Sequence, residues 1–486
     1  MNQPAPRFVL GLFAASLTLL LGAASFAQAQ LPTFTPLHAN GIYAPGETVG
    51  WTVALPAGAA TQPSRYTYTV KTNDMDVLKT GSFDLSSGTA TIETSFDAPA
   101  MLHVTVDNAA APPPQLSVAE INRINDRLKA LLAKGDPALK SIFDEHPDLN
   151  IVSTPPPSAG APAPDHVATL GAAVAPAKLQ PSVSRPADFD AFWTAKLKAL
   201  KKIPIHPVLV RTPTTQTGVE LYTVTLDSIG SHVRGYLAKP NRKGKFPALV
   251  IYQYAGVYAL QPVWATNRAA EGWLVFDVDS HDLPPDQATG VPKNYYTIGN
   301  NDREHSYFLN MYLRDTRAID YIASRPDWNG KVIVVTGTSM GGQQSLVTAA
   351  LNPKRISAVV VNEPSGADSN GELHGRKIGY PNWPSDDPQV MKTALYFDTV
   401  NFASRIEAPT LLSVGFIDSI ALPAGIWTAL NQIPGPKEVV PMVESDHNNF
   451  TPQKQGAYQQ RSEEVLATIL HGGRFKPNEE LTRPRP

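Results

Sequence analysis

Ser339 is the residue of this sequence whose neighbours indicate its chemistry most clearly. It lies in Thr336-Gly-Thr-Ser-Met-Gly-Gly-Gln343, directly after the apolar run Val332-Ile-Val-Val335 and before a helical pattern from Gln343 to Leu351. Residues 337–341 fit G-x-S-x-G, a turn between a strand and a helix where the outer glycines prevent collisions around the serine. The pattern predicts an exposed nucleophilic serine, and the alternative is a glycine-rich packing corner.

A serine hydroxyl is a weak nucleophile, so it needs a base and an acid that orients the base. Three histidines follow Ser339 in the chain: His374, His447 and His471. Active groups of a doubly wound sheet lie beyond the carboxyl ends of its strands. Only His447 directly follows a predicted strand, whereas His374 lies in a polar, glycine-rich stretch and His471 follows a long amphipathic helix. We therefore predict His447 as the base.

The same positional test predicts the orienting acid. Asp418 comes three residues after the buried run Thr410-Leu-Leu-Ser-Val-Gly415. Asp446 is adjacent to His447, and a side chain in that position rarely reaches its neighbour's ring, while Glu444 still lies in the strand exit. The chain order of serine, acid and histidine that accompanies this kind of turn favours Asp418. The predicted catalytic residues are therefore Ser339, Asp418 and His447.

The elements that must position these three residues begin at about residue 186, where buried strand runs alternate with helical patterns. The runs are Ala248–Tyr252, Trp273–Asp277, Val332–Val335, Ala358–Val361, Thr410–Val414 and Val439–Val440. Helical patterns include residues 315–324 and 463–471. Continuous apolar strands between helices predict an α/β fold, a mostly parallel doubly wound sheet with helices on both faces. Two more polar runs, residues 220–226 and 233–239, predict an antiparallel edge.

The part of the chain before residue 186 has a different hydrophobic pattern. Residues 31–110 alternate in period two between turn clusters, which predicts a small all-β sandwich of immunoglobulin type. Residues 111–185 are predicted as a connecting region that contains a helix and a linker. The helix covers about 118–134 after the capping box Ser117-Val-Ala-Glu120, and the Pro/Ala-rich linker covers 154–164. The catalytic domain is predicted at 186–476.

Composition limits the classes of function. Lys plus Arg number 41 and Asp plus Glu number 43, so no basic excess favours nucleic-acid binding. The absence of cysteine excludes disulfides, thiol nucleophiles and thiolate metal sites. Residues 1–29 predict a signal peptide, because Arg7 precedes an apolar stretch of signal length and a small-residue site ending at Ala29. The prediction is a secreted or periplasmic protein without a membrane segment after cleavage.

Several segments carry a resemblance to a known family. They are Arg185-Pro-Ala-Asp-Phe-Asp-Ala-Phe-Trp193, Ser306-Tyr-Phe-Leu-Asn-Met-Tyr-Leu313, Gly337-Thr-Ser-Met-Gly-Gly342, Asn401-Phe-Ala403 and Val414-Gly-Phe-Ile-Asp418, with Pro423 and His447. Residues from about 186 to 473 thereby resemble the acetyl xylan esterase and cephalosporin-C deacetylase family of α/β-hydrolases. Three positions depart from that family. Met340 replaces a glutamine, Tyr252-Gln-Tyr-Ala-Gly256 replaces His-Gly-Tyr, and Asp277-Val-Asp-Ser-His-Asp282 replaces an Arg-Gly-Gln segment.

The resemblance implies a serine carboxylic ester hydrolase that removes acetyl groups from xylan or a related plant polysaccharide through an acetyl-serine intermediate. The backbone N–H of Met340 would stabilise the oxyanion, with a second N–H from Ala255 or Tyr254, of which we choose Ala255. Tyr254, Tyr258, Trp264 and Trp383 are candidates for a sugar cleft, although core or loop packing is an equally good interpretation of each. No cofactor and no metal are predicted.

Two other functions are compatible with parts of the sequence. A serine peptidase of the prolyl oligopeptidase type shares the order of the triad, but such enzymes usually carry a large propeller before the hydrolase domain. A non-catalytic carbohydrate-binding protein on a hydrolase fold is the second alternative, and the complete triad argues against it. The esterase is therefore the function that the sequence favours.

Overall fold

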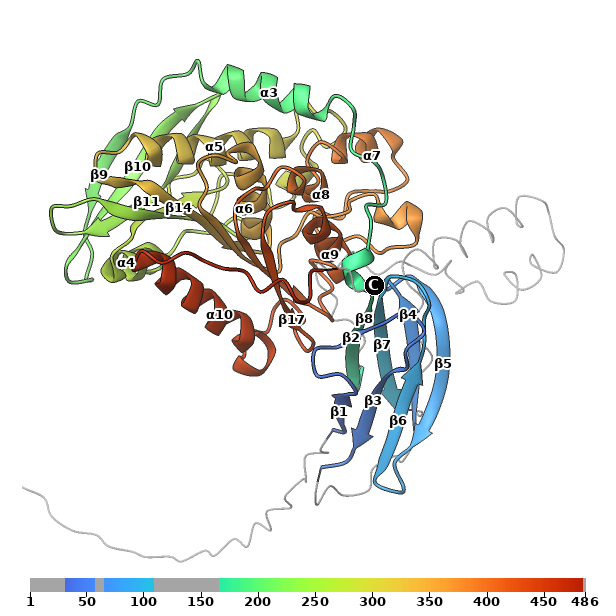
Figure 1. Ribbon diagram of the computed structural model, residues 1–486. Coiled ribbons are helices and arrows are strands. Elements are labelled where there is room, and N and C mark those ends of the chain that lie inside the picture. The colour runs from blue at the N-terminus through green and yellow to red at the C-terminus, as the bar shows by residue number, and fades with distance from the viewer. Residues whose placement is uncertain (1–30, 57–64, 109–165, 484–486) are drawn as a thin grey trace, which may run out of the picture.

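The computed structural model describes residues 31–56, 65–108 and 166–483, which form two domains (Figure 1). The larger domain contains a nine-stranded sheet of order β17-β16-β15-β14-β12-β13-β11-β10-β9. Its strands β12 to β17 are parallel, and β9, β10 and β11 form an antiparallel edge. The strands are β9 (Val208–Thr212), β10 (Val219–Ser228), β11 (Ser231–Pro240), β12 (Phe246–Tyr252), β13 (Leu274–Asp279), β14 (Trp328–Thr338), β15 (Ala358–Asn362), β16 (Thr410–Gly415) and β17 (Lys437–Met442). The predicted α/β fold is confirmed.

Helices cover both faces of this sheet (Figure 1). On one face α4 (Pro262–Glu271) and α10 (Pro452–Leu470) bury Ala265, Ala269, Leu466 and Ile469 against the strands. A hydrophobic cluster lies on each face of this sheet, and the larger cluster is on the other face. The helices around it are α3 (Phe189–Leu200), α5 (Tyr307–Ser324), α6 (Met340–Leu351), α7 (Pro388–Ala394), α8 (Thr399–Ala403) and α9 (Pro423–Gln432). Three short 3₁₀ helices, η1 (Pro176–Lys178), η2 (Tyr295–Thr297) and η3 (Gly371–His374), complete the described elements.

The strand order brings the three predicted catalytic residues to one edge of the sheet. Ser339 follows β14 directly, Asp418 follows β16, and His447 follows β17. Because these strands are parallel, their carboxyl ends meet at the same edge. Residues more than 100 positions apart in the sequence therefore lie in neighbouring loops.

The smaller domain consists of two β-sheets that share one core. One sheet has the order β1-β3-β6 and the other the order β2-β8-β7-β4-β5. The strands are β1 (Thr33–Pro36), β2 (Ile42–Tyr43), β3 (Val49–Ala54), β4 (Arg65–Thr72), β5 (Asp76–Asp84), β6 (Thr89–Thr94), β7 (Ala100–Asn108) and β8 (Ala168–Val174). Trp51 and Ile92 from the first sheet pack with Val70 and Val104 from the second. This is the predicted all-β sandwich, and its assignment to the immunoglobulin type stays a prediction.

Strand β8 corrects the predicted connecting region. Residues 168–174 were expected within a helix and linker, yet they pair with β7 over seven residues and complete the sandwich. The sequence Ala-Thr-Leu-Gly-Ala-Ala-Val is rich in residues with low strand propensity, so local pattern did not reveal it. The strand forms because Leu170, Ala172 and Val174 fill the sandwich core. Residues 111–165 of the predicted connecting region, with helix 118–134 and linker 154–164, lie outside the described residues, as does the predicted signal peptide at 1–29.

The sandwich packs against the loop that carries the predicted catalytic acid. A Cβ on Gly171 would lie 2.6 Å from Cβ of Phe416, and a Cβ on Gly41 would lie 2.9 Å from the Phe416 ring. The N–H of Lys377 donates to the carbonyl of Asn73 at 3.1 Å, and the Lys377 ammonium pairs with Asp74. Because both contact points are glycines, the smaller domain packs directly against the loop of residues 416–418.

Among the described residues, no helix combines the length and apolar character that crossing a bilayer requires.

Candidate active site

Ser339 lies on a strained turn between β14 and α6. Its backbone has φ 57° and ψ −121°, a left-handed conformation that L-residues avoid, and its N–H donates to the carbonyl of Asn362 at 2.9 Å. A Cβ on Gly337 would lie 2.4 Å from the carbonyl carbon of Gly341, and a Cβ on Gly341 would lie 2.2 Å from the carbonyl oxygen of Tyr252. Only glycine fits at either position, which is the steric reason for the G-x-S-x-G pattern.

The structure brings Ser339, His447 and Asp418 together. Oγ of Ser339 lies 2.9 Å from Nε2 of His447, and Nδ1 of His447 lies 2.7 Å from Oδ2 of Asp418. The tautomer with a proton on Nδ1 satisfies both contacts, since Nδ1–H then donates to Asp418 while Nε2 accepts from the serine hydroxyl. The other carboxylate oxygen of Asp418 accepts the N–H groups of Ile420 and Ala421 at 2.8 Å each, which fixes the carboxylate plane.

Burial and charge have opposite effects on His447. Burial alone lowers the pKa of the imidazole, but the hydrogen bond and the charge of Asp418 outweigh it, and the pKa lies above its ordinary value. All three side chains are nearly inaccessible to solvent. A base of raised pKa that contacts a serine hydroxyl can accept its proton during attack on a carbonyl carbon.

A second buried carboxylate, Glu363, adjoins this trio and was missed by the sequence reasoning. Its Oε2 lies 3.9 Å from Nδ1 of His447, too far for a hydrogen bond. Ser445 Oγ–H donates to Glu363 at 2.5 Å and the amide of Gln455 donates at 3.0 Å. Burial raises the pKa of Glu363 to about 7, and the charge of Asp418 adds to the increase. Glu363 directly follows β15, so the positional test that selected Asp418 would also have found it.

The ligand atoms of Glu363, Asp418 and His447 lie within 4.8 Å of one another, a spacing that could also hold a metal ion. Imidazole and carboxylate ligands suit zinc. Here, however, Nδ1 of His447 already contacts Asp418, and both oxygens of Glu363 accept hydrogen bonds from Ser445 and Gln455. We therefore interpret the cluster as a serine triad with an additional carboxylate, and the expectation of a metal-free site stays a prediction.

The two predicted oxyanion donors lie on neighbouring segments. Met340 is the first residue of α6, so its N–H has no acceptor within the helix. The loop that follows β12 borders the turn, because the Cβ position of Gly341 lies 3.3 Å from the carbonyl carbon of Gln253. Ala255 lies in this loop, two residues farther along. Its role as the second donor stays a prediction.

Buried polar side chains hold this loop in place, and the sequence reasoning did not assign them a role. Nε2 of His281 lies 2.9 Å from the carbonyl oxygen of Gly256, and the N–H of Gly256 donates to the hydroxyl of Tyr295 at 3.3 Å. Burial lowers the pKa of His281 to about 4, so the ring is neutral and donates from Nε2 while Nδ1 contacts Tyr307. The Tyr295 hydroxyl also contacts Sδ of Met340 at 3.2 Å. The segment that departs from the family pattern thus anchors the loop.

The predicted sugar-contacting aromatic residues separate into two groups. Tyr254, Tyr258 and Trp264 form one cluster, with the Tyr254 and Tyr258 rings stacked at 4.5 Å. Trp383 is buried at 4% exposure, packs against Phe308 and donates from Nε1 to the carbonyl of Tyr296 at 2.7 Å. Trp383 is therefore a core residue here, because its ring fills the space beside α5 instead of facing a cleft.

We expect Glu363→Gln to change the pH dependence more than the maximal rate. Ionised Glu363 raises the pKa of His447, so its replacement should move the acidic limb of kcat/KM to lower pH only near and above about pH 7, where Glu363 carries its charge. Stability should change as well. The raised pKa means that folded Glu363 holds a proton which the unfolded chain has lost between about pH 4.5 and 7, so wild-type stability falls as pH rises through this window. In the variant, the free energy of unfolding should not show the decrease that Glu363 causes as pH rises from about 4.5 to 7.

Urea unfolding at pH 5 to 8 and pH–rate profiles on an aryl acetate measure both effects. Glu444→Gln is the matched control, since Glu444 is exposed one residue before Ser445. We expect the control to follow the wild type. Identical unfolding curves for Glu363→Gln and wild type across the whole range would contradict the prediction.

The chain is similar to known proteins in both sequence and fold. Residues 177–369 and 379–463, more than half of the chain, match the family model described as acetyl xylan esterase (AXE1). The acetyl esterase Axe7A of Xylanibacter ruminicola is 34% identical over 280 residues, which are 54% of this chain and 64% of that protein. The chain therefore spans less than two thirds of that relative's length.

Two solved structures are similar to the larger domain. Acetyl xylan esterase from Paenibacillus sp. R4 has 26% sequence identity and a TM-score of 0.52, covering 60% of this chain and 98% of its own. Acetyl xylan esterase 1 from Thermoanaerobacterium sp. JW/SL YS485 has 22% identity and a TM-score of 0.51, covering 59% and 97%, and this likeness shows the fold alone. With the family model matched over most of its α/β domain, the chain belongs to the acetyl xylan esterase family.

Proposed function

We propose that this protein is a serine carboxylic ester hydrolase that removes O-acetyl groups from xylan or a related plant polysaccharide. The observation that carries the proposal is the chain of contacts from Ser339 Oγ through His447 to Asp418, at 2.9 and 2.7 Å. Membership in the acetyl xylan esterase family supports the acetyl ester as the substrate group.

In this mechanism Oγ of Ser339 attacks the acetyl carbonyl carbon while Nε2 of His447 takes its proton. Asp418 keeps the ring in the required tautomer and stabilises the imidazolium. The N–H of Met340 and the second donor of the β12 loop bind the oxyanion. His447 then protonates the departing sugar oxygen, which leaves acetyl-serine. Water attacks the acetyl carbon of the acetyl-serine while His447 takes a proton from that water. His447 then passes this proton to Oγ of Ser339 as the Oγ–acetyl bond breaks, and acetate leaves.

Acetate release from acetylated xylan, acetylated mannan and acetylated pectin tests the proposal. We expect measurable release from xylan, hydrolysis of p-nitrophenyl acetate and no cleavage of a prolyl p-nitroanilide. Cleavage of the anilide alone would replace the proposal with a peptidase. We expect chelators to leave the activity unchanged, because no step of this mechanism requires a metal.

We also propose that the protein is exported, on the basis of the sequence of residues 1–29. The expected mature N-terminus is Gln30, which follows the small-residue cleavage site. N-terminal sequencing of the protein recovered from outside the cytoplasm would check this, and recovery of an uncleaved Met1 there would contradict it.

A further inference from the structure

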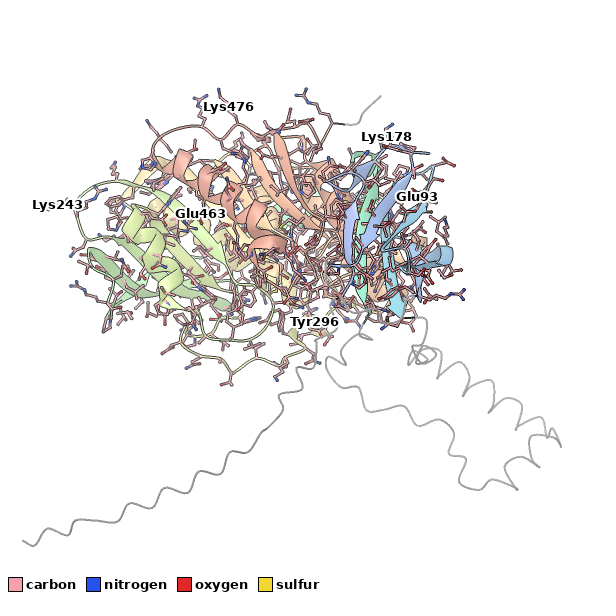
Figure 2. The ribbon with its side chains drawn as sticks, turned by 90° about the horizontal axis from the view of Figure 1, so that it is seen from below. Glu93, Lys178, Lys243, Tyr296, Glu463 and Lys476 are labelled. Atoms are coloured by element: carbon pink, nitrogen blue, oxygen red, sulfur yellow. The ribbon has the colours of Figure 1, made fainter. Side chains whose placement is uncertain are left out.

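A cavity of about 530 Å³ lies on the α4 and α10 side of the large sheet, separate from the contacts of the triad. Its lining includes Tyr254 and Tyr258 from the β12 loop, Trp264 from α4, Tyr458 from α10 and Asp277 from β13. The volume falls within the range of small-molecule pockets, about 300–1,000 Å³. Figure 2 looks onto the sheet face that α10 covers and labels Glu463, another lining residue, on that helix.

Three aromatic rings form one wall of this cavity. The stacked rings of Tyr254 and Tyr258 lie 6.2 and 6.4 Å from Trp264, which meets Tyr258 edge-on. Tyr254 remains 45% exposed although its ring takes part in the cluster. An exposed, prearranged aromatic surface offers an electron-rich face to weakly positive C–H groups.

Asp277 places a carboxyl group where the strand pattern calls for an apolar side chain. Val275 faces the α4 and α10 cluster, and Asp277 follows two residues later on the same side of β13. Asp277 is fully buried, and neither carboxyl oxygen has a hydrogen-bond partner among the described residues. Burial raises its pKa well above the ordinary value, and the charge of Asp279 adds to this increase. A neutral carboxyl group both donates and accepts hydrogen bonds.

Among the described residues, the single arginine at the cavity, Arg268, is paired with two glutamates. Arg268 lines the cavity and donates two hydrogen bonds to the carboxylate of Glu463 from α10. The bond from Nη1 measures 2.7 Å. The same guanidinium contacts Glu271 at 3.1 Å. Because the arginine is occupied by two carboxylates, it offers no free charge to an anionic ligand. The lining therefore disfavours an anionic occupant and leaves a neutral, hydroxyl-rich ligand as the candidate.

We propose that this cavity is a second, non-catalytic carbohydrate site that binds a neutral sugar ring of the polysaccharide. The apolar C–H face of the sugar would lie against Tyr254 and its neighbours, and a ring hydroxyl would pair with the carboxyl of Asp277 once the side chains that cover this carboxyl move aside. Buried polar groups are costly when unpaired, and a hydroxyl-rich ligand would give Asp277 the partner it lacks. The class of sugar rests on the proposed function.

The site adjoins the catalytic turn. Thr338, which directly precedes Ser339, and Gln253, whose carbonyl carbon approaches Gly341, also line the cavity. A polysaccharide bound here would therefore contact the loop that borders the predicted oxyanion hole. The same loop supplies Tyr254 and Tyr258, so one segment serves both sites.

Calorimetric titration of the full-length protein with xylotriose tests the proposal, because this sugar has no ester and binding is measured without turnover. We expect binding at the cavity that Tyr254→Ala, which removes the exposed ring of the stacked pair, weakens at least about tenfold. Tyr254→Phe keeps the ring and should keep the affinity within about twofold. Phe450→Ala is the matched control, since it removes a 59% exposed aromatic side chain outside the cavity lining.

Asp277→Val separates a binding role from a structural one. Replacing a buried carboxyl that lacks partners with an apolar side chain of similar size should raise the melting temperature. The same variant should bind xylotriose at least about tenfold more weakly. A structural role alone would change the stability but not the affinity.

Absence of binding at millimolar xylotriose would overturn the inference, and so would unchanged affinity in both Tyr254→Ala and Asp277→Val. If the wild-type protein bound xylotriose but released acetate from none of the acetylated polysaccharides, the proposed function would be overturned and this inference would stand. The two failures are therefore distinguishable.

Discussion

Ser339→Ala is expected to lower kcat for acetate release by about ten-thousandfold or more, while the protein stays folded. The hydroxyl is the atom that would form the acetyl bond, and nothing else in the triad replaces it. Alanine keeps the Cβ and hence the sterics of the turn, so the unfolding free energy should change by less than about 1 kcal/mol. Acetate release from acetylated xylo-oligosaccharides is the measurement, together with circular dichroism and urea unfolding.

Ser345→Ala is the matched control for this prediction. Ser345 is buried six residues farther along, and its hydroxyl donates to the carbonyl of Gly341 within α6 at 2.8 Å. That contact is local to the helix, so we expect kcat within about threefold of wild type. Full activity in Ser339→Ala would reject the serine mechanism and revive a metal-dependent or non-catalytic interpretation of the site.

Gly341→Ala is expected to destabilise the protein by about 3 kcal/mol or more and to lower kcat/KM by about a hundredfold. The new Cβ would lie 2.2 Å from the carbonyl oxygen of Tyr252, which is backbone and has little freedom to move. Relief requires α6 and β12 to separate, and this would displace both Ser339 and the N–H of Met340. Urea unfolding and steady-state kinetics measure the two effects.

The same substitution at Gly456 should have the opposite sign. Gly456 lies inside α10, and its nearest neighbour to a new Cβ is Pro452 Cβ at 3.8 Å, an ordinary contact. Alanine in an open helical position lowers the entropy of the unfolded chain and should stabilise by about 0.5–1 kcal/mol. If Gly341→Ala were as stable as Gly456→Ala, the steric explanation of the elbow would be wrong.

The triad could be selected from the sequence because its position depends on local pattern. Each member directly follows, or nearly follows, a buried apolar run, and such runs identify themselves by composition. Parallel strands then bring their carboxyl ends to one edge whatever the details of packing. Glu363 meets the same test after β15, so the positional test alone does not distinguish it from Asp418.

Strand β8 and the four aromatic candidates show where local pattern was insufficient. β8 is an alanine- and glycine-rich stretch whose strand state depends on burial beside β7 and on the approach of Phe416 to Gly171. Trp383 and Tyr254 are both aromatic residues in loops, yet one fills the core beside Phe308 and the other stays 45% exposed. Side-chain environment of this kind depends on which segments pack together.

By itself, then, the sequence determined the α/β fold and the three residues that meet at its edge, because strand periodicity and chain order are local properties. Only the tertiary structure decided that Asp277 faces a cavity with Tyr254, Tyr258 and Trp264, and that Glu363 lies 3.9 Å from His447. Contacts between segments from different strands depend on strand order, packing and burial. The free energy of those contacts belongs to the folded chain as a whole and not to any single segment.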